Sequence, residues 1–379
     1  MSLRVLHVVA TDQRRGAEVF AADLVRSLDE LGVAQLVVTI RPGWGGVAYV
    51  AETAELMSGN PRPAGPSVHA RAVLRLRRLV RTWKPDVVQA HGGEALKNCV
   101  AARVERQAPL VYRRIGGAPR SLRSRPRRDL YRWLMGRSRR IVSLAEAITR
   151  ETIALFDIEP WRVVTIPNGV DRRRLDGSTG RSGARKRLGL APHARVLLSL
   201  AALTWEKDPI AHLDVASRVL KRCPDAVHLF AGDGPMSRDV HRRIASLGLG
   251  DRIRLLGARG DVPDLMSASD VLLFASRPDG MEGMPTIMIE AGMSSLPVAG
   301  FDVAGAGEVV IEGETGVLVP WGAREELGDA ALAILIDDER RRSLGTAARR
   351  ACIERFDVSQ LTPRYLGLYE ELAGADHGA

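Results

Sequence analysis

Short apolar runs alternate with segments of helical periodicity along the whole chain. Residues 4–10 have the composition of a buried strand, and residues 17–31 carry large apolar side chains three and four positions apart, which predicts a helix. The same plan restarts with a strand at 195–200 and a helix at 208–220. Strands that alternate with helices in this way form parallel sheets covered by helices. The sequence therefore predicts an α/β fold.

The other elements follow from the same periodicity. Further strands are expected at residues 35–40, 86–90, 109–113, 141–144, 162–166, 226–231, 252–256 and 270–275. Further helices are expected at residues 70–83, 94–106, 126–136, 146–155, 286–293 and within 355–372. Two stretches rich in glycine, proline, serine or arginine are expected to be irregular, namely a loop at 41–66 and an exposed connector at 172–186.

The length of 379 residues exceeds what one hydrophobic core usually serves, so two domains are expected. The pattern of strands and helices is interrupted at Pro167-Asn168-Gly169 and then begins again. We therefore expect a first domain at residues 1–168 and a second at 169–356, each with a doubly wound, Rossmann-like sheet.

The net charge of +10 is unevenly distributed. Residues 113–140 contain eleven arginines and a single acid, Asp129, and such a surface attracts phosphates or an anionic membrane. The helix predicted at 126–136 interleaves its arginines with Leu130 and Trp133, which suits a helix at a membrane interface or one packed on a sheet. A third interpretation is a solvated surface whose arginines reflect only a GC-rich genome.

Composition also excludes some protein classes. No run approaches the roughly 20 apolar residues that cross a bilayer, and residues 4–10 fit a strand better than a signal peptide. The three cysteines have no metal-ligand spacing, so reduced thiols in a cytoplasmic protein are expected, with attachment to the inner face of the membrane as an alternative. Aromatic residues make up 4% of the chain and no nucleic-acid-binding motif accompanies the arginines, so nucleic acid is not an expected partner.

The stretch from Pro278 to Pro297 has the features of an anion site. It follows the strand predicted at 270–275, and Gly280 and Gly283 allow the backbone of the intervening loop to approach a ligand closely. Pro285 suits the first turn of the next helix. The unpaired N–H groups and positive dipole end of that helix favour an anion such as a diphosphate.

Charged residues accompany this helix terminus. Glu282 lies in the loop, and Glu290 shares a helix face with Thr286. Apolar residues surround Glu290 in the sequence, where a buried carboxylate without a function would be costly. Lys207 immediately precedes another predicted helix, where the dipole would repel it unless an anion were bound nearby.

These features resemble the E-x7-E signature of the retaining glycosyltransferases of family 4 (glycosyl transferases group 1), with Glu282 and Glu290 as its two glutamates. Other segments match the family in order, so that the resemblance extends over nearly the whole chain: PNGVD at 167–171, EKD at 206–208, GDGP at 232–235 and FDVAGAGE at 301–308. The resemblance implies the GT-B fold, in which two Rossmann-like domains face each other across a cleft. The first domain would bind the acceptor, the second the nucleotide-sugar donor, and a last helix at 357–373 would cross back to the first domain.

The resemblance also implies roles for individual residues. Glu282 would lie beside the donor sugar, Glu290 would bind the nucleotide ribose, and Lys207 would contact the donor diphosphate. His91, at the end of the strand at 86–90, would face the donor sugar. The residues implied in catalysis are thus His91, Lys207 and Glu282. Donor binding is implied for Gly283, Met284, Thr286, Ile287, Glu290 and Arg259, and contact with the acceptor or diphosphate for Gly16 and Ala17.

Three positions depart from the family pattern. Arg15 replaces the first glycine of a GGAE turn, which limits how closely a ligand approaches that backbone. Ala202 stands where an arginine is usual, so one charge-assisted hydrogen bond, typically worth about 1.5–3 kcal/mol, is missing unless another arginine supplies it. Ser295 replaces a glycine before Pro297.

The implied reaction moves a sugar from a UDP- or GDP-sugar to an acceptor hydroxyl with retention of configuration. In same-face attack the leaving diphosphate takes the acceptor's proton, so no dedicated nucleophile, metal or other cofactor is expected. The acceptor would be a glycan, a lipid-linked sugar or a small molecule such as an antibiotic aglycone. Two alternatives remain: a nucleotide-sugar epimerase of the same fold, and a non-catalytic scaffold that binds anions or a membrane.

Overall fold

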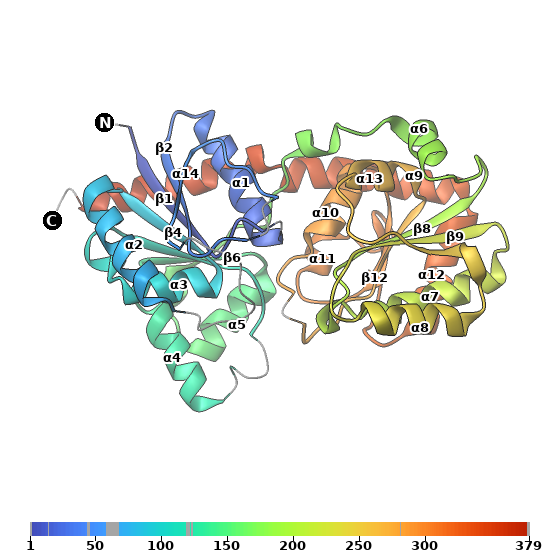
Figure 1. Cartoon of the computed structure of the whole chain (residues 1–379), viewed down its shortest axis with the longest axis horizontal. Coiled ribbons are helices and arrows are strands. Elements are labelled where there is room, and N and C mark those ends of the chain that lie inside the picture. The colour runs from blue at the N-terminus through green and yellow to red at the C-terminus, as the bar shows by residue number, and fades with distance from the viewer. Residues whose placement is uncertain are drawn as a thin grey trace. The chain divides into compact units, whose positions relative to one another are not determined.

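The computed structural model describes residues 2–13, 15–43, 46–57, 68–118, 122, 124–280 and 282–376. The chain folds into two compact units, one comprising Met1–Val170 with Val358–Ala379 and the other comprising Asp171–Asp357 (Figure 1). Each unit has its own parallel sheet packed with helices. The predicted α/β class with two Rossmann-like units is thereby confirmed.

In the described part of the first unit, seven strands form one sheet in the order β3-β2-β1-β4-β5-β6-β7, and all pairings are parallel. The strands are β1 (Arg4–Val9), β2 (Ala34–Thr39), β3 (Glu52–Glu55), β4 (Val87–His91), β5 (Leu110–Arg114), β6 (Arg140–Ser143) and β7 (Val163–Thr165). The strand order reverses between β1 and β4, and ligands of doubly wound sheets bind at the carboxyl ends of such strands.

Helices cover both faces of the first sheet, because successive strand residues point to opposite sides. The helices are α1 (Gly16–Asp29), α2 (Ala70–Trp83), α3 (Gly92–Ala101), α4 (Arg125–Met135), α5 (Glu146–Phe156) and α14 (Val358–Asp376), with short 3-10 helices η1 (Val104–Arg106) and η3 (Pro160–Arg162). Leu6 and Val8 pack in one core with side chains of α2 to α5, and Val5 packs in a second core with side chains of α1 and α14.

The prediction that residues 41–66 form a loop is wrong at β3, which pairs with β2 at the edge of the sheet. Its sequence, ETAE, has no apolar alternation, and most of it is exposed. Edge strands are often short and charged because one side is left unpaired, and a strand of this kind gives no hydrophobic signal. Residues 44, 45 and 58–66 of the expected loop lie outside the described residues.

Six parallel strands form the sheet of the second unit, within its described residues, in the order β10-β9-β8-β11-β12-β13. The strands are β8 (Arg195–Leu200), β9 (Ala226–Ala231), β10 (Ile253–Leu255), β11 (Val271–Phe274), β12 (Val298–Phe301) and β13 (Gly316–Val319). The α-helices are α6 (Gly180–Arg187), α7 (Pro209–Arg222), α8 (Ser237–Leu247), α9 (Val262–Ala268), α10 (Thr286–Met293), α11 (Ala306–Val309), α12 (Arg324–Ile336) and α13 (Asp338–Phe356). The 3-10 helices are η4 (Arg172–Leu175), η5 (Trp205–Lys207) and η6 (Gly250–Arg252). The reversal of strand order in this sheet falls between β8 and β11.

The connector predicted at 172–186 is largely exposed, as expected, but the prediction that it is irregular is wrong, since this segment forms η4 and α6. The Asp171 carboxylate caps η4 by accepting a hydrogen bond from Arg173 N (3.0 Å). In α6, Arg185 is only 5% exposed because it pairs with Asp270. Charge pairing of this kind leaves no apolar periodicity in the sequence.

Near the C-terminus, the helix expected within 355–372 is divided between two elements. Asp357, with φ −62° and ψ 130°, separates α13 from α14. Thr362 on α14 donates a hydrogen bond to Ser27 on α1 (2.8 Å), so α14 packs within the first unit.

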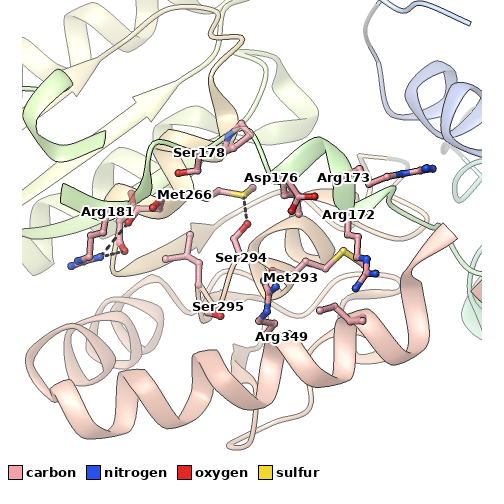
Figure 2. A pocket seen from close by; sticks show the side chains of 16 residues that line it. Arg172, Arg173, Asp176, Ser178, Arg181, Met266, Met293, Ser294, Ser295 and Arg349 are labelled. Atoms are coloured by element: carbon pink, nitrogen blue, oxygen red, sulfur yellow. Dashed lines mark hydrogen bonds between the residues drawn. The ribbon is translucent and has the colours of Figure 1, made fainter. Parts of the chain in front are cut away.

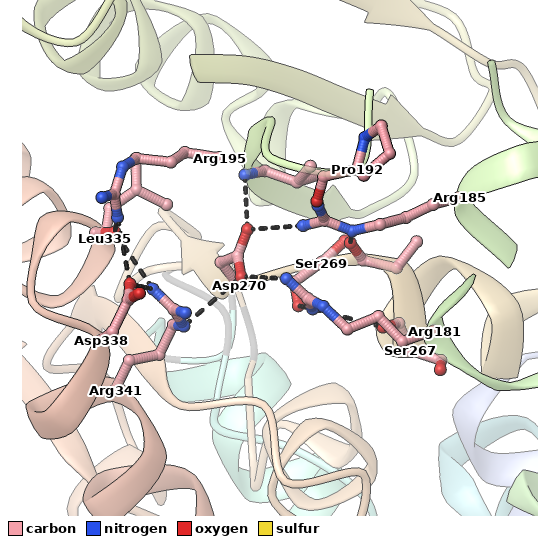
Figure 3. A network of polar contacts seen from close by, with 12 residues as sticks. Arg181, Arg185, Pro192, Arg195, Ser267, Ser269, Asp270, Leu335, Asp338 and Arg341 are labelled. Atoms are coloured by element: carbon pink, nitrogen blue, oxygen red, sulfur yellow. Dashed lines mark hydrogen bonds and ion pairs between the residues drawn. The ribbon is translucent and has the colours of Figure 1, made fainter. Parts of the chain in front are cut away.

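Asp270 joins four elements of the second unit (Figure 3). Its carboxylate, which is 3% exposed, precedes β11 and accepts hydrogen bonds from Val196 N (2.8 Å), Arg185 Nη2 (3.0 Å) and Arg181 Nη2 (2.5 Å). Arg341 Nε, on α13, lies 3.4 Å away. Removing one partner of a buried ion pair leaves the other charge buried and uncompensated. Asp270 therefore holds α6 and α13 against the amino end of the β8–β11 pair.

We expect Asp270→Ala to lower the free energy of unfolding of the second unit by about 3–5 kcal/mol, because it leaves the buried Arg185 guanidinium without a carboxylate to balance its charge. Urea denaturation of wild type and variant measures this change. Asp239→Ala, which removes an ion pair with Arg242 on the surface of α8, is the matched control and should leave the midpoint nearly unchanged. Equal midpoints for Asp270→Ala and wild type would contradict this account of the network.

Candidate functional site

Lys207 and Glu282 meet where the strands of the second sheet end. Lys207 is the last residue of η5, which follows β8, and Glu282 lies in the loop between β11 and α10. Lys207 Nζ donates a hydrogen bond to Glu282 Oε1, and the two side chains are 34% and 11% exposed. Although 75 positions separate the two residues, β8 and β11 are neighbours in the sheet.

Close backbone packing defines the path of the loop after β11. Arg277 N donates to Glu206 O (2.9 Å), and a Cβ on Gly280 would lie 2.9 Å from the same oxygen. On the other side of the loop, Gly305 has φ +75°, and a Cβ there would lie 2.3 Å from Gly283 O. Side chains at 280 and 305 would therefore displace the loop that carries Glu282.

Helix α10 begins at Thr286 directly after this loop and ends at Met293, which matches the predicted helix at 286–293. Pro285 occupies the N-cap position and makes no side-chain capping hydrogen bond. Gly283 and Met284 are buried, whereas Thr286 and Ile287 are half-buried. The first-turn N–H groups and the helix dipole make this terminus electropositive. Because Lys207 bonds to Glu282 in the preceding loop, its ammonium lies in the same region, where the Glu282 carboxylate balances its charge.

Glu290 lies one turn further along α10 and pairs with an arginine that sequence reasoning missed. Arg174 Nη2 donates to Glu290 Oε1 over 3.0 Å, and the side chains are 20% and 15% exposed. Arg174 belongs to η4, in the segment expected to be an exposed connector. A short helix capped by Asp171 is the one local signal that could have placed this arginine in a structured element.

Another missed arginine, Arg277, lies near the end of β11. Its Nη1 is 3.5 Å from Asp208 Oδ2 and its Nε is 3.3 Å from Asp279 Oδ1. Its guanidinium carbon also lies 4.5 Å from the ring centroid of Trp205 and 5.3 Å from that of Trp321. Position 202 carries alanine where the family usually has an arginine. Arg277 nevertheless places a guanidinium beside η5.

A buried histidine supports the start of the same loop. Ala275 N donates to His212 Nε2 (3.2 Å), so the proton of this ring lies on Nδ1, which bonds to Ser199 Oγ (2.9 Å). The Ser199 hydroxyl then donates to His228 Nε2 (2.9 Å). Burial lowers the pKa of both histidines to about 3, so both rings are neutral near pH 7.

Arg259 follows β10 and binds a neighbouring carboxylate. Its Nε and Nη2 donate to Asp261 at 2.8 and 2.5 Å. Gly257 O in the same loop accepts a hydrogen bond from Gly232 N (2.8 Å), so the loops after β9 and β10 touch. The guanidinium of Arg259 is therefore already bound to Asp261. The backbone of this loop lies at the same edge of the sheet as η5.

In the first unit, His91 is the last residue of β4 and is 3% exposed. Gln35 Nε2 donates to Val25 O (2.8 Å), so Gln35 Oε1 accepts from His7 Nε2 (3.2 Å). His91 Nε2 lies 3.2 Å from His7 Nδ1 and 3.4 Å from Gln89 Nε2. The other ring nitrogen, His91 Nδ1, is buried and has no hydrogen-bond partner among the described residues. Burial also holds the pKa of His91 well below its usual range.

Gly16 and Ala17 form the first turn of α1. Gly16 is exposed, and a Cβ there would meet no atom within 4 Å, so packing alone does not require glycine. Arg15 is the N-cap residue, and its side chain makes no capping hydrogen bond. Burial raises the pKa of Glu18, in the same turn, to about 7. Arg14 lies outside the described residues.

The structure thus brings Lys207, Glu282 and the N-terminus of α10 together in the second unit, with Glu290 on the same helix. His91, Gly16 and Ala17 belong to the first unit. In the part of the chain that the structure describes, no three histidine, cysteine or acidic side chains are grouped closely enough to hold a metal ion. None of the described helices combines the length and apolar character that a membrane span requires.

Comparison with known proteins identifies the family. Residues 14–174 match the family described as Glycosyltransferase Family 4, and residues 181–351 match Glycosyl transferases group 1. An Escherichia coli UDP-Gal:alpha-D-GlcNAc-diphosphoundecaprenol alpha-1,3-galactosyltransferase is 24% identical over 80% of this chain and 79% of its own length. A D-inositol 3-phosphate glycosyltransferase of Kribbella flavida is 25% identical over 89% of this chain and 86% of its own.

A solved structure extends the likeness to the fold. Anabaena HepE, in complex with UDP and glucose, superposes with a TM-score of 0.82 and 21% identity, covering 98% of this chain and all of the other (100%). The two family matches together extend over most of the sequence and meet near the boundary between the two units. The chain therefore belongs to the family 4 (group 1) glycosyltransferases, enzymes that have the GT-B fold.

Proposed function

We propose that the second unit binds a nucleotide-diphosphate sugar and that the enzyme transfers the sugar to an acceptor hydroxyl with retention of configuration. The bond between Lys207 and Glu282 beside the N-terminus of α10 carries this proposal. Cleavage of the glycosyl–phosphate bond places negative charge on the leaving diphosphate. An ammonium and backbone N–H groups that are already in position stabilise that charge without reorganisation.

The side chains at this site suit same-face attack. Lys207 and the amides from Gly283 to Ile287 would bind the diphosphate, while Glu282 holds the flexible lysine side chain and lies beside the sugar. The departing phosphate oxygen would take the proton of the acceptor hydroxyl as the new glycosidic bond forms. The protein then has to supply no covalent nucleophile, and we assign none.

Other donor contacts are proposed from the family resemblance and the local geometry. Glu290 would bind the ribose hydroxyls, with Arg174 orienting its carboxylate. The loop that carries Arg259 would line the base pocket with its backbone. UDP is the favoured nucleotide because HepE was solved with UDP and the E. coli relative is named for a UDP-sugar, and a GDP-sugar is the alternative.

Acceptor binding is proposed for the first unit. Gly16 and Ala17 leave the N-terminus of α1 open to an anionic group, and His91 Nδ1 would form a hydrogen bond with a sugar hydroxyl once the side chains that cover it move. A lipid-linked sugar fits the name of the E. coli relative, and a phosphorylated small molecule fits that of the Kribbella relative. Both remain candidates for the acceptor.

We further propose that α4 attaches the enzyme to the anionic inner face of the cytoplasmic membrane. Leu130 and Trp133 are 50% and 51% exposed, and Arg125, Arg127 and Arg132 of the same helix are exposed as well. This combination of apolar anchors and cations suits an anionic lipid interface. Residues 119–121 and 123 of the arginine-rich segment lie outside the described residues.

The activity is tested by nucleotide release from UDP- and GDP-sugars in the presence and absence of candidate acceptors. Wild type should release nucleotide with an acceptor present, and Lys207→Ala should lower kcat by about 10²-fold, as expected for loss of a group that stabilises developing charge. Lys221→Ala, on the exposed end of α7, is the matched control and should retain full activity. Epimerisation of the donor without any acceptor, or normal turnover by Lys207→Ala, would contradict the proposed reaction.

Glu290→Ala should raise the KM for the donor by about 10- to 100-fold, because a charge-assisted hydrogen bond is worth about 1.5–3 kcal/mol. Its kcat at saturating donor should change less, since the contact is made to the ribose and not to the reacting atoms. Steady-state kinetics at varied donor concentration separate the two effects. Glu326→Ala, at an exposed position of α12, serves as the control, and an unchanged donor KM in Glu290→Ala would remove the ribose assignment.

Vesicle sedimentation tests the membrane contact. The enzyme should pellet with phosphatidylglycerol vesicles at low salt and not with phosphatidylcholine vesicles, and added salt should release it. A Leu130→Ser/Trp133→Ser variant should bind less, whereas Trp161→Ser, at a tryptophan that is 59% exposed elsewhere in the first unit, should bind normally. Equal binding by both variants would place the contact elsewhere.

A further inference from the structure

A cavity of about 480 Å³ lies in the second unit at the C-terminal end of α10 (Figure 2). Its walls come from η4, from Met266 and Ser267 of α9, from the segment 293–296, and from Arg349 of α13. None of the residues assigned above to donor binding lines it. The volume is within the range of small-molecule sites, about 300–1,000 Å³. The cavity is thus a separate candidate site.

The lining is strongly cationic. It includes Arg172, Arg173, Arg181 and Arg349 against one carboxylate, that of Asp176. Two of these arginines are committed to the protein, since Arg173 binds Asp171 (2.8 Å) and Arg181 binds Asp270. The C-terminal end of a helix dipole is itself negative, so any attraction for an anion here comes from the side chains.

Arg172 and Arg349 retain hydrogen-bond donors for a ligand. Arg172 meets Asp357 Oδ2 through Nε at 3.4 Å, and no described residue accepts from its two Nη groups. Arg349 donates one N–H to Met293 O, the carbonyl that ends α10, and no carboxylate among the described residues lies within ion-pair distance of it. Figure 2 shows Arg172 extending from η4 towards α13 and Arg349 extending from α13 towards the end of α10. Guanidinium groups from η4 and from α13 thus both line the cavity, and guanidinium N–H groups are well suited to bind the oxygens of a phosphate.

The rest of the lining suits a hydroxylated body attached to that phosphate. The carboxylate of Asp176 and the hydroxyls of Ser267 and Ser295 make no hydrogen bond to another described residue, and Met266 and Met293 supply apolar surface. Ser295 has φ +58°, a conformation that favours glycine and costs a serine of the order of 1–3 kcal/mol. This strained residue is one of those that line the cavity.

We propose that this cavity binds a phosphorylated sugar or polyol, with its phosphate between Arg172 and Arg349 and its hydroxyls towards Asp176 and Ser295. The ligand acts on the donor site through η4. Arg172 and Leu175 of this four-residue helix line the cavity, whereas Arg174 binds Glu290. A phosphate that holds Arg172 keeps η4 in place and so keeps Arg174 on Glu290. Binding of a sugar phosphate in the cavity therefore lowers the KM for the donor. This effect on KM rests on the proposed function, whereas the binding of the sugar phosphate does not.

Calorimetry with glucose 6-phosphate and glycerol 3-phosphate tests the site, in the presence of saturating UDP so that the donor site is filled. At least one of the two should bind more tightly than inorganic phosphate, and glucose should not bind. Arg172→Gln and Arg349→Gln should each raise Kd by at least about tenfold. Arg350→Gln, at the next and exposed position of α13, is the matched control and should not change Kd. Arg172→Gln leaves the hydrogen bond from Arg349 to Met293 O in place. A change in Kd in this variant is therefore not caused by loss of that bond.

Further outcomes separate this site from the donor site. Lys207→Ala should bind the sugar phosphate as wild type does, even if the enzyme proves inactive. Binding that Lys207→Ala abolishes and Arg172→Gln retains would place the ligand in the donor site and overturn the proposal. Equal affinity for inorganic phosphate, or no saturable binding of either probe at millimolar concentration, would overturn it as well. Where binding is found, an unchanged donor KM at saturating ligand would remove the coupling through η4.

Discussion

Parallel pairing of β8 with β11 is the constraint on which the candidate donor site depends. Leu197 and Leu198 pair with Val271 and Leu272, so the two strands end at the same edge of the sheet. Lys207 and Glu282 leave that edge in consecutive loops and meet. At the opposite end of the same pair, Asp270 accepts a hydrogen bond from Val196 N. A buried carboxylate at the amino ends of the strands thus sets the register of residues that act at their carboxyl ends.

The two ends of α10, both proposed to bind anions, would do so for different physical reasons. At the N-terminus the backbone supplies the positive charge, because its first N–H groups have no partners within the helix. At the C-terminus the dipole is negative, and arginine side chains must first satisfy the last carbonyl, as Arg349 does for Met293 O. A helix of eight residues spans only about 12 Å. Glu290 lies between these ends and is held by Arg174 of η4. It is therefore close enough to be affected by an anion bound at either end.

Periodicity and the spacing of motifs predict many of the parts of the fold that bury apolar surface, although the buried strand β12 and the helix α12 were not predicted. The helices at 70–83 and 286–293 were predicted with the bounds that the structure shows, because their apolar residues recur on one face or their termini carry turn residues. The strand β3 and the helix α6 were missed, since polar side chains form both. For the same reason sequence reasoning could propose Glu290 but not its partner Arg174, which is 116 positions away and is placed by η4. Ion pairs over such separations have no local pattern.

The buried histidines of both units fix the positions of neighbouring groups through hydrogen bonds and do not transfer protons. Burial lowers the pKa of His7 to about 4 and those of His212 and His228 to about 3, from an ordinary value of 6.5. Each ring is therefore neutral near pH 7, and the fold loses stability as the pH falls below 6.5, where the unfolded chain binds protons that the folded chain excludes. A neutral ring donates from one nitrogen and accepts at the other, so each chain of hydrogen bonds has a fixed direction. His91 lies at the end of one such chain, and because burial holds its pKa well below its usual range, the ring is neutral and is a poor acid near pH 7. That property suits a reaction in which the proton passes from the acceptor hydroxyl to the departing phosphate and the protein provides only the electrostatic environment.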